Sequence, residues 1–291
     1  MLDRGENLSL ALDRNEPAAL DFTLQVERLY AALIAAANSG PGLGTNSEPE
    51  LGGKFLYAGE LDRQCRALLV AGNIAGAASL AVTADSAAQK QAIRDGVADF
   101  LVTSLDEALR ILKNQIRKRE TVAVCVALAP QAPEADFACR MLERGVLPDL
   151  LPPGFSGTSR FSTFFGPGVR QIELVAPEDS QTLLTWHVAA APAIWLPKLD
   201  AIALDCLSPD SSPAASAARR WLRLAPRYLG RLAQGVRLLR CGESFAANFL
   251  ERVREQVERA EIGVPVEIRL SGRGECEEYW LSPPRGSESA G

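Results

Sequence analysis

The sequence predicts an α/β protein whose main domain is a parallel sheet flanked by helices, followed by a second, smaller α/β portion. Apolar strand-like runs alternate with helical segments of about 10–15 residues over residues 53–151, a pattern typical of parallel sheets with right-handed crossovers. The run over 121–128, Thr-Val-Ala-Val-Cys-Val-Ala-Leu, is almost wholly apolar, as expected of a strand buried on both faces. Apolar residues make up 47% of the chain and charged residues 23%, which excludes wholesale disorder.

An amphipathic N-terminal helix is expected over 17–37, because Pro17 suits a first helical turn and leucines recur near helical spacing. A linker rich in Gly and Pro follows over 39–49. Ser104 and Glu107 form a capping box at the start of one helix, and Gly145 suits the end of another. The main domain is expected to hold strands over 54–58, 79–83, 97–102 and 121–128, a last short edge element over 146–151, and helices over 60–75, 85–94, 105–118 and 134–144.

A long connection rich in Gly, Pro, Ser and Phe spans 152–168 and leads into the second portion. There we expect strands over 169–175, 201–206, 236–241 and 264–270, and helices over 178–191, 214–233 and 243–260. The expected domains are 1–50 (helix and linker), 51–152 (main domain), 153–281 (second portion) and 282–291 (flexible tail).

Composition narrows the possible partners. Lys and Arg number 31 against 36 Asp and Glu, and the net charge of −5 argues against nucleic acid or an anionic membrane. No apolar stretch approaches the ~18 residues of a membrane span, and the N-terminal residues do not resemble a signal peptide. The six cysteines show no paired spacing, so neither a metal site nor a disulfide framework is predicted. We expect a cytoplasmic protein that binds neither membranes nor nucleic acids.

Four segments carry a resemblance to a known family. They are Gly53-Lys54 opening a strand, residues 71–80 (Ala-Gly-Asn-Ile-Ala-Gly-Ala-Ala-Ser-Leu), residues 103–111 (Thr-Ser-Leu-Asp-Glu-Ala-Leu-Arg-Ile) and residues 141–149 (Met-Leu-Glu-Arg-Gly-Val-Leu-Pro-Asp). In this order they resemble the Rossmann-like NAD-binding domain of urocanase (urocanate hydratase), over about one third of the chain. The resemblance implies a lyase of histidine breakdown that adds water to urocanate with NAD as an electrophile. It also implies a Gly-rich loop after the first strand, where the NAD diphosphate meets a helix N-terminus.

The sequence departs from that pattern where the cofactor would bind. The family's loop, Ala-Gly-Leu-Gly-Gly-Met-Gly-Gly, is replaced by residues 58–66, which keep only Gly59 and add the negative charges of Glu60 and Asp62. Two cations of the same segment would offset part of that charge, and Thr83, with Asp85 two positions later, stands where an acidic residue would hold the adenosine ribose. The degenerate cofactor site therefore consists of Gly59, Glu60, Asp62, Arg63, Arg66, Thr83 and Asp85.

The same residues have a second interpretation, in which Gly59 ends a strand and the acids stabilise the first turn of a helix. The leading expectation is that no cofactor is bound, and NAD is the alternative. The family's Tyr-Gly-Asn-Asn-Ile-Arg-like motif is missing, and His187 is the single His, expected on an apolar helix beside Trp186. It is a candidate acid–base group, although a packing role fits its surroundings better.

Three functions remain open. The leading hypothesis is a urocanase-related protein that has lost canonical NAD binding and urocanate hydration, and is either non-catalytic or repurposed. The second is an active, divergent hydratase or lyase that uses NAD or another small anionic ligand. The third is an assembly or binding module that pairs with a larger protein through the N-terminal helix or the Phe-rich connection, with a homo-oligomer as its self-associating form.

Overall fold

The computed structural model describes residues 16–38, 50–130, 134–154, 168–174, 181–207, 212–233, 235–272 and 275–284. The chain divides into two compact units. One consists of Leu24–Val175 and Arg227–Arg231, and the other of Met1–Thr23, Ala176–Pro226 and Leu232–Gly291. The expected linker over 39–49 lies outside the described residues, as does most of the connection over 152–168 and of the tail.

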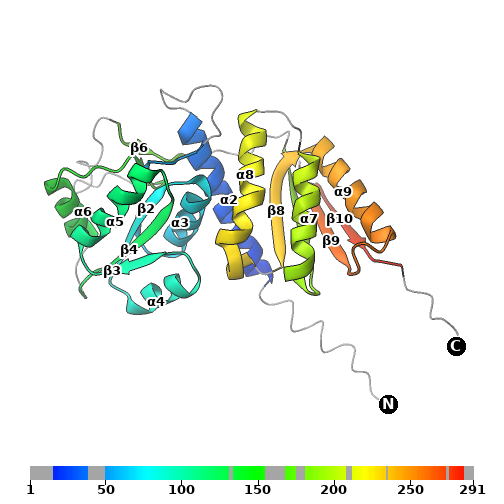
Figure 1. Cartoon of the computed structure of the whole chain (residues 1–291), viewed down its shortest axis with the longest axis horizontal. Helices are drawn as coiled ribbons and strands as arrows, with labels where there is room; N and C mark the ends of the chain where they lie inside the picture. Colours follow the sequence, from blue (N-terminus) through cyan, green and yellow to red (C-terminus); the bar gives the residue numbers. More distant parts are fainter. Residues whose placement is uncertain are drawn as a thin grey trace, which may run out of the picture. The chain divides into compact units, whose positions relative to one another are not determined.

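The first unit contains a six-stranded sheet, in which all strand pairs are parallel. Its spatial order is β3-β4-β2-β1-β5-β6, and β2, β3, β4 and β6 are labelled in Figure 1. The strands are β1 (Phe55–Glu60), β2 (Ala78–Thr83), β3 (Phe100–Val102), β4 (Val122–Ala127), β5 (Leu150–Leu151) and β6 (Arg170–Gln171). The predicted α/β class with a parallel sheet is therefore confirmed. The expected edge element over 146–151 is instead an inner strand, because β6 pairs with the far side of β5.

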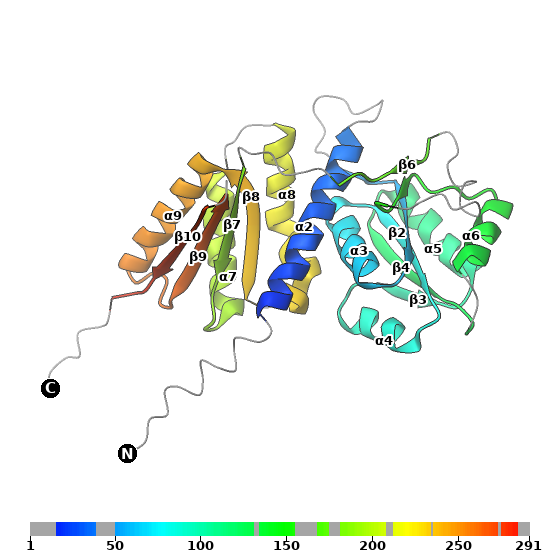
Figure 2. The same ribbon diagram turned by 180° about the vertical axis from the view of Figure 1, so that it is seen from behind.

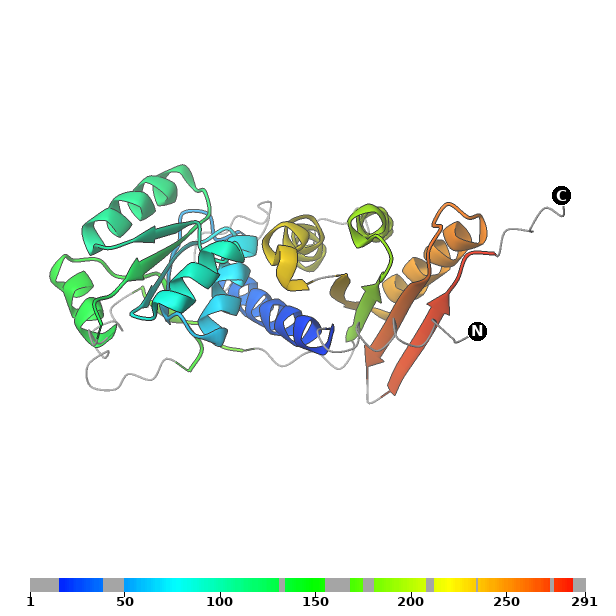
Figure 3. The same ribbon diagram turned by 90° about the horizontal axis from the view of Figure 1, so that it is seen from below.

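Helices cover both faces of this sheet (Figure 3). They are α3 (Arg63–Ala75), α4 (Ser86–Arg94), α5 (Leu105–Lys118) and α6 (Glu134–Glu143). α3 and α4 pack on one face, while α5 and α6 cover the other and bury side chains such as Leu109, Phe137 and Met141 against Tyr57 and Leu80. As predicted, the Ser104 hydroxyl caps α5 by accepting a hydrogen bond from the backbone N–H of Glu107 at 3.2 Å.

The expected N-terminal helix is present as α2 (Glu16–Asn38). Its C-terminal part belongs to the first unit, where Arg170 donates a hydrogen bond to the carbonyl of Ala36 at 3.1 Å. None of the helices that the structure describes is long and apolar enough to cross a membrane.

The second unit contains an antiparallel sheet of order β10-β9-β7-β8. Its elements are β7 (Gln181–His187), α7 (Pro192–Cys206), α8 (Pro213–Leu229, which ends in the first unit), η2 (Gly230–Ala233), β8 (Val236–Gly242), α9 (Glu243–Glu258), β9 (Val266–Gly272) and β10 (Glu275–Leu281). α7 and α9 lie on the same face of the sheet (Figure 2). Trp186 is fully buried there, with its ring 5.0 Å from that of Phe249.

Three predictions for the second portion are wrong. The strand expected over 169–175 contains β6, which pairs with β5 in the parallel sheet of the first unit rather than in the second. The expected helix over 178–191 is the strand β7, in which buried Leu184 and Trp186 alternate with less buried neighbours, a period of two. The expected strand over 201–206 is the end of α7, which begins at Pro192 and buries Leu196, Leu199 and Ala203 at helical spacing. β10 was not predicted, because its sequence, Glu-Cys-Glu-Glu-Tyr-Trp-Leu, is largely exposed and carries little apolar pattern.

Candidate functional site

The predicted cofactor residues lie at the carboxyl ends of β1 and β2, in the first unit. β1 sits between β2 and β5 in the sheet. The chain leaves β1 through α3 on one face and enters β5 through α6 on the other. A reversal of this kind opens a crevice at the carboxyl ends of the strands, where α/β proteins bind their ligands. The end of β1 and the starts of α3 and α6 therefore form the candidate site.

Gly59 forms part of a β-bulge at the end of β1. Tyr57 pairs with Leu80 and Gly59 with Ala81, so Ala58 is an extra residue in the strand. Gly59 has a φ of +86°, in the left-handed region that favours glycine, and a Cβ at this position would lie 3.2 Å from Oε1 of Glu134. The start of α6 thus closes on the turn to which the resemblance assigns the Gly-rich loop.

Asp62 caps the helix that follows. It directly precedes α3, and its Oδ1 accepts a hydrogen bond from the backbone N–H of Cys65 at 2.7 Å. A carboxylate in this position satisfies one of the free N–H groups of the first turn and interacts favourably with the positive end of the helix dipole. The helix N-terminus at which a diphosphate would bind already holds an anion from its own chain.

The two predicted cations do not converge on this turn. Arg66 forms an ion pair with Asp95, the residue after α4, and both side chains are largely buried. Asp95 also accepts a hydrogen bond from Nε2 of Gln91 at 2.8 Å. Arg63 is exposed in the first turn of α3. Arg66 therefore ties α3 to α4, which leaves Arg63 as the predicted cation available to a ligand.

Thr83 and Asp85 complete the turn between β2 and α4. Thr83 is buried, and its hydroxyl accepts a hydrogen bond from the backbone N–H of Asp85 at 3.1 Å. Asp85 caps α4, with its Oδ1 accepting from the N–H of Ala87 at 2.8 Å. The carboxylate that would hold a ribose is thus used at a helix N-terminus.

Tyr57 and Glu134 are site residues that the sequence did not reveal. The fully buried Tyr57 hydroxyl donates a hydrogen bond to Oε1 of Glu134 at 2.8 Å, across 77 positions of sequence. Burial raises the pKa of Tyr57 well above its ordinary value, and the Glu134 charge adds to this effect. Burial also raises the pKa of Glu134, reinforced by the charges of Glu60 and Asp62 and opposed by the Tyr57 hydrogen bond. The sequence features that could have pointed to this pair are a tyrosine near a strand end and a glutamate in a first helical turn. Each feature is too common in proteins to identify the pair.

A buried cysteine lies beside this pair. Burial, and then the negative charge of Asp62, raises the pKa of the Cys65 thiol well above its ordinary value. Cys65 is therefore a neutral thiol and a poor nucleophile, since reactivity belongs to the thiolate.

These residues do not fit NAD. Glu60, Asp62 and Glu134 are close enough for their charges to interact, and they place three carboxylates around the expected diphosphate position. Like charges about 4 Å apart cost roughly 1 kcal/mol even in bulk water, and several times more near a protein surface. The Glu134 carboxylate occupies the space beside Gly59 that the absence of a Cβ would otherwise leave open. The single glycine of this turn therefore opens no space for a phosphate.

His187 belongs to the other unit and lies on β7 rather than on a helix. Its Nδ1 is 3.6 Å from Oε2 of the buried Glu267, which also forms an ion pair with Arg269. A Cβ at Gly235 would lie 3.1 Å from Nε2 of His187, so the ring packs closely on the start of β8. These contacts favour the packing interpretation over an acid–base role.

Metal ligation has no basis in the described part of the chain. No group of three or more His, Cys, Asp or Glu side chains arranged to hold a metal ion is found there. A comparison of the chain with models of known protein families finds no match.

Proposed function

We propose that the chain is a urocanase-related protein whose Rossmann-like domain has lost canonical NAD binding and the hydration of urocanate. The observation that carries this proposal is the Asp62 carboxylate at the N-terminus of α3, where it accepts the Cys65 N–H. The same turn is closed by Glu134 and bears the charge of Glu60. The relation to urocanase rests on the resemblance over residues 53–152.

NAD titration tests the proposal directly. A ligand that binds only the native state at about 100 times its Kd stabilises a protein by roughly 2.7 kcal/mol, which raises the Tm of a domain of this size by several degrees. We expect no rise in Tm at millimolar NAD, no nucleotide released on denaturation of the purified protein, and no loss of the urocanate ultraviolet band.

A saturable rise in Tm, or NAD that co-purifies with the protein, would overturn the proposal and favour a divergent lyase. An Arg63→Gln variant provides the matched control, because Arg63 is the exposed predicted cation at this turn. Binding that disappears in the variant would place NAD at this turn. Binding that persists would place it elsewhere.

A homo-oligomer is a second candidate function, favoured by the edge strand β3. Phe100 and Leu101 are 45% and 40% exposed on this strand, and Ile93 of the neighbouring α4 is 41% exposed. Pairing of β3 with its copy would join apolar side chains without opposing like charges. The acidic edge strand β10, with Glu275, Glu277 and Glu278, would repel its own copy.

We further infer that the protein works in a reducing compartment such as the cytoplasm. All six cysteines are free, which supports this location.

A further inference from the structure

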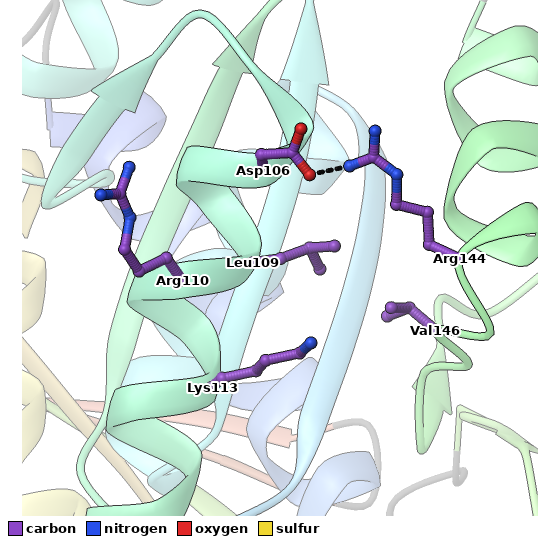
Figure 4. A pocket seen from close by; sticks show the side chains of 6 residues that line it. All are labelled: Asp106, Leu109, Arg110, Lys113, Arg144 and Val146. Carbon is purple, nitrogen blue, oxygen red and sulfur yellow. Dashed lines mark hydrogen bonds and ion pairs between the residues drawn. The ribbon is translucent and has the colours of Figure 1, made fainter.

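A pocket of about 410 Å³ lies between α5 and the segment that joins α6 to β5 (Figure 4). Its lining residues are Asp106, Leu109, Arg110, Lys113, Arg144 and Val146. None of them belongs to the candidate site at the carboxyl ends of β1 and β2. The volume falls within the range of small-molecule sites, which is roughly 300–1,000 Å³.

The side chains that face the gap divide into an apolar middle and two polar ends. Asp106, Leu109 and Lys113 recur at helical spacing and therefore share one face of α5. Leu109 lies opposite Val146, with the ion pair of Asp106 and Arg144 at one end and Lys113 at the other (Figure 4). Arg110 points away from the gap and contributes to its rim.

The charges of the pocket favour an anion. Among the described residues, Asp106 is matched by Arg144, whereas Lys113 forms no ion pair. Arg144 uses Nη1 toward Asp106, and a guanidinium has five N–H donors in total, so further donors remain for a second oxyanion. This local excess of cations occurs in a chain whose net charge is −5.

We propose that this pocket binds a small organic anion. Its apolar body packs on Leu109 and Val146 in the middle of the pocket, and its phosphate or carboxylate group lies at the Lys113 end. Pockets of this kind combine an apolar lining with a few polar groups that fix the orientation of the ligand. The proposal does not depend on whether NAD binds at the candidate site, because the two sites share no residue.

Phenyl phosphate is a suitable probe, with phenol and inorganic phosphate as its two halves. We expect calorimetry on the full chain to detect phenyl phosphate binding, and each half to bind at least about tenfold more weakly. In ¹H–¹⁵N spectra, the amide shifts should concentrate at residues 109–113 and 144–147. Lys113→Gln should weaken binding about five- to tenfold, because it removes one charge and keeps most of the side chain.

Lys118→Gln is the matched control. Lys118 is exposed on the same helix, outside the pocket, and pairs with Glu120 at 3.8 Å. The affinity of the Lys118→Gln variant for phenyl phosphate should stay within about twofold of the wild-type value, because salt screens a charge this far from the pocket. Lys113 is also exposed, so both variants should fold, and thermal unfolding checks this. No binding at 10 mM (about −2.7 kcal/mol), equal losses in both variants, or shifts centred on residues 58–66 would each overturn the proposal.

Discussion

At the scale of single residues, Glu134 couples the candidate site to pH. Burial, followed by the charges of Glu60 and Asp62, raises its pKa above the ordinary 4.5. A carboxyl group with a raised pKa contributes stability that is fully present below its unfolded pKa. This contribution is lost as the pH rises through the folded pKa.

Glu134→Gln removes this dependence, because glutamine stays neutral and can still accept the Tyr57 hydrogen bond. Relative to the wild type, we expect the free energy of unfolding of the variant to rise as the pH increases from below 4.5 toward neutrality. Urea unfolding at a series of pH values measures the difference. Glu143→Gln, an exposed change on the same helix, is the control. A difference that is constant with pH, or that grows toward acid, would contradict the prediction.

Residue-level prediction succeeded where the signal was local. Gly59, Glu60 and Asp62 were expected at one turn, and the helix-start interpretation of Asp62 agrees with its hydrogen bond to Cys65. The Tyr57–Glu134 pair could not be predicted, because it depends on how α6 crosses the end of β1. Sequence spacing carries no information on that crossing.

At the scale of secondary-structure elements, α3 depends on the Asp62 cap. Asp62→Ala removes the acceptor for the Cys65 N–H and should lower the free energy of unfolding by about 1 kcal/mol. Asp62→Asn keeps an acceptor oxygen while removing the charge, and should cost less than half as much. Urea unfolding monitored by circular dichroism compares the two. Equal losses would show that the charge, rather than the cap, stabilises the helix.

Elements with strong local signals were predicted well, and those without them were not. α5 matches its expected bounds because Ser104, Glu107 and the leucine spacing all act within the helix. β7 was mistaken for a helix because Leu183 and Leu184 fit either period. Its identity is fixed by pairing with β8 and β9, which are more than 45 positions away in sequence.

At the scale of the whole molecule, the apolar β3 edge predicts self-association. Light scattering should give a mass approaching twice the chain's 31.2 kDa at high concentration. A Phe100→Ser/Leu101→Thr variant should stay monomeric, because it removes the apolar contact at the edge. Trp280→Ser, at a residue that is 64% exposed in the other unit, is the control. A monomer at every concentration, or a variant that still dimerises, would refute the prediction.

The parallel sheet was predictable as a class, since alternating strands and helices leave few topologies. The places of β5 and β6 in the sheet were not, because both are two-residue strands whose positions depend on their neighbours: β5 was expected at the edge and β6 in the second portion. The second portion, expected simply as α/β, proved to be an antiparallel sheet. Its strand order depends on tertiary pairing that no local pattern records.

On the proposal that NAD binding was lost, the Asp62 cap would also determine how easily this turn could regain a cofactor-binding sequence. A glycine loop at this turn would have to replace the carboxylate that caps α3. The intermediate with that single substitution would have lost the helix cap and would still face Glu60 and Glu134, so it would be less stable without yet holding a cofactor. On this proposal, selection on folding stability alone would keep the turn as it is.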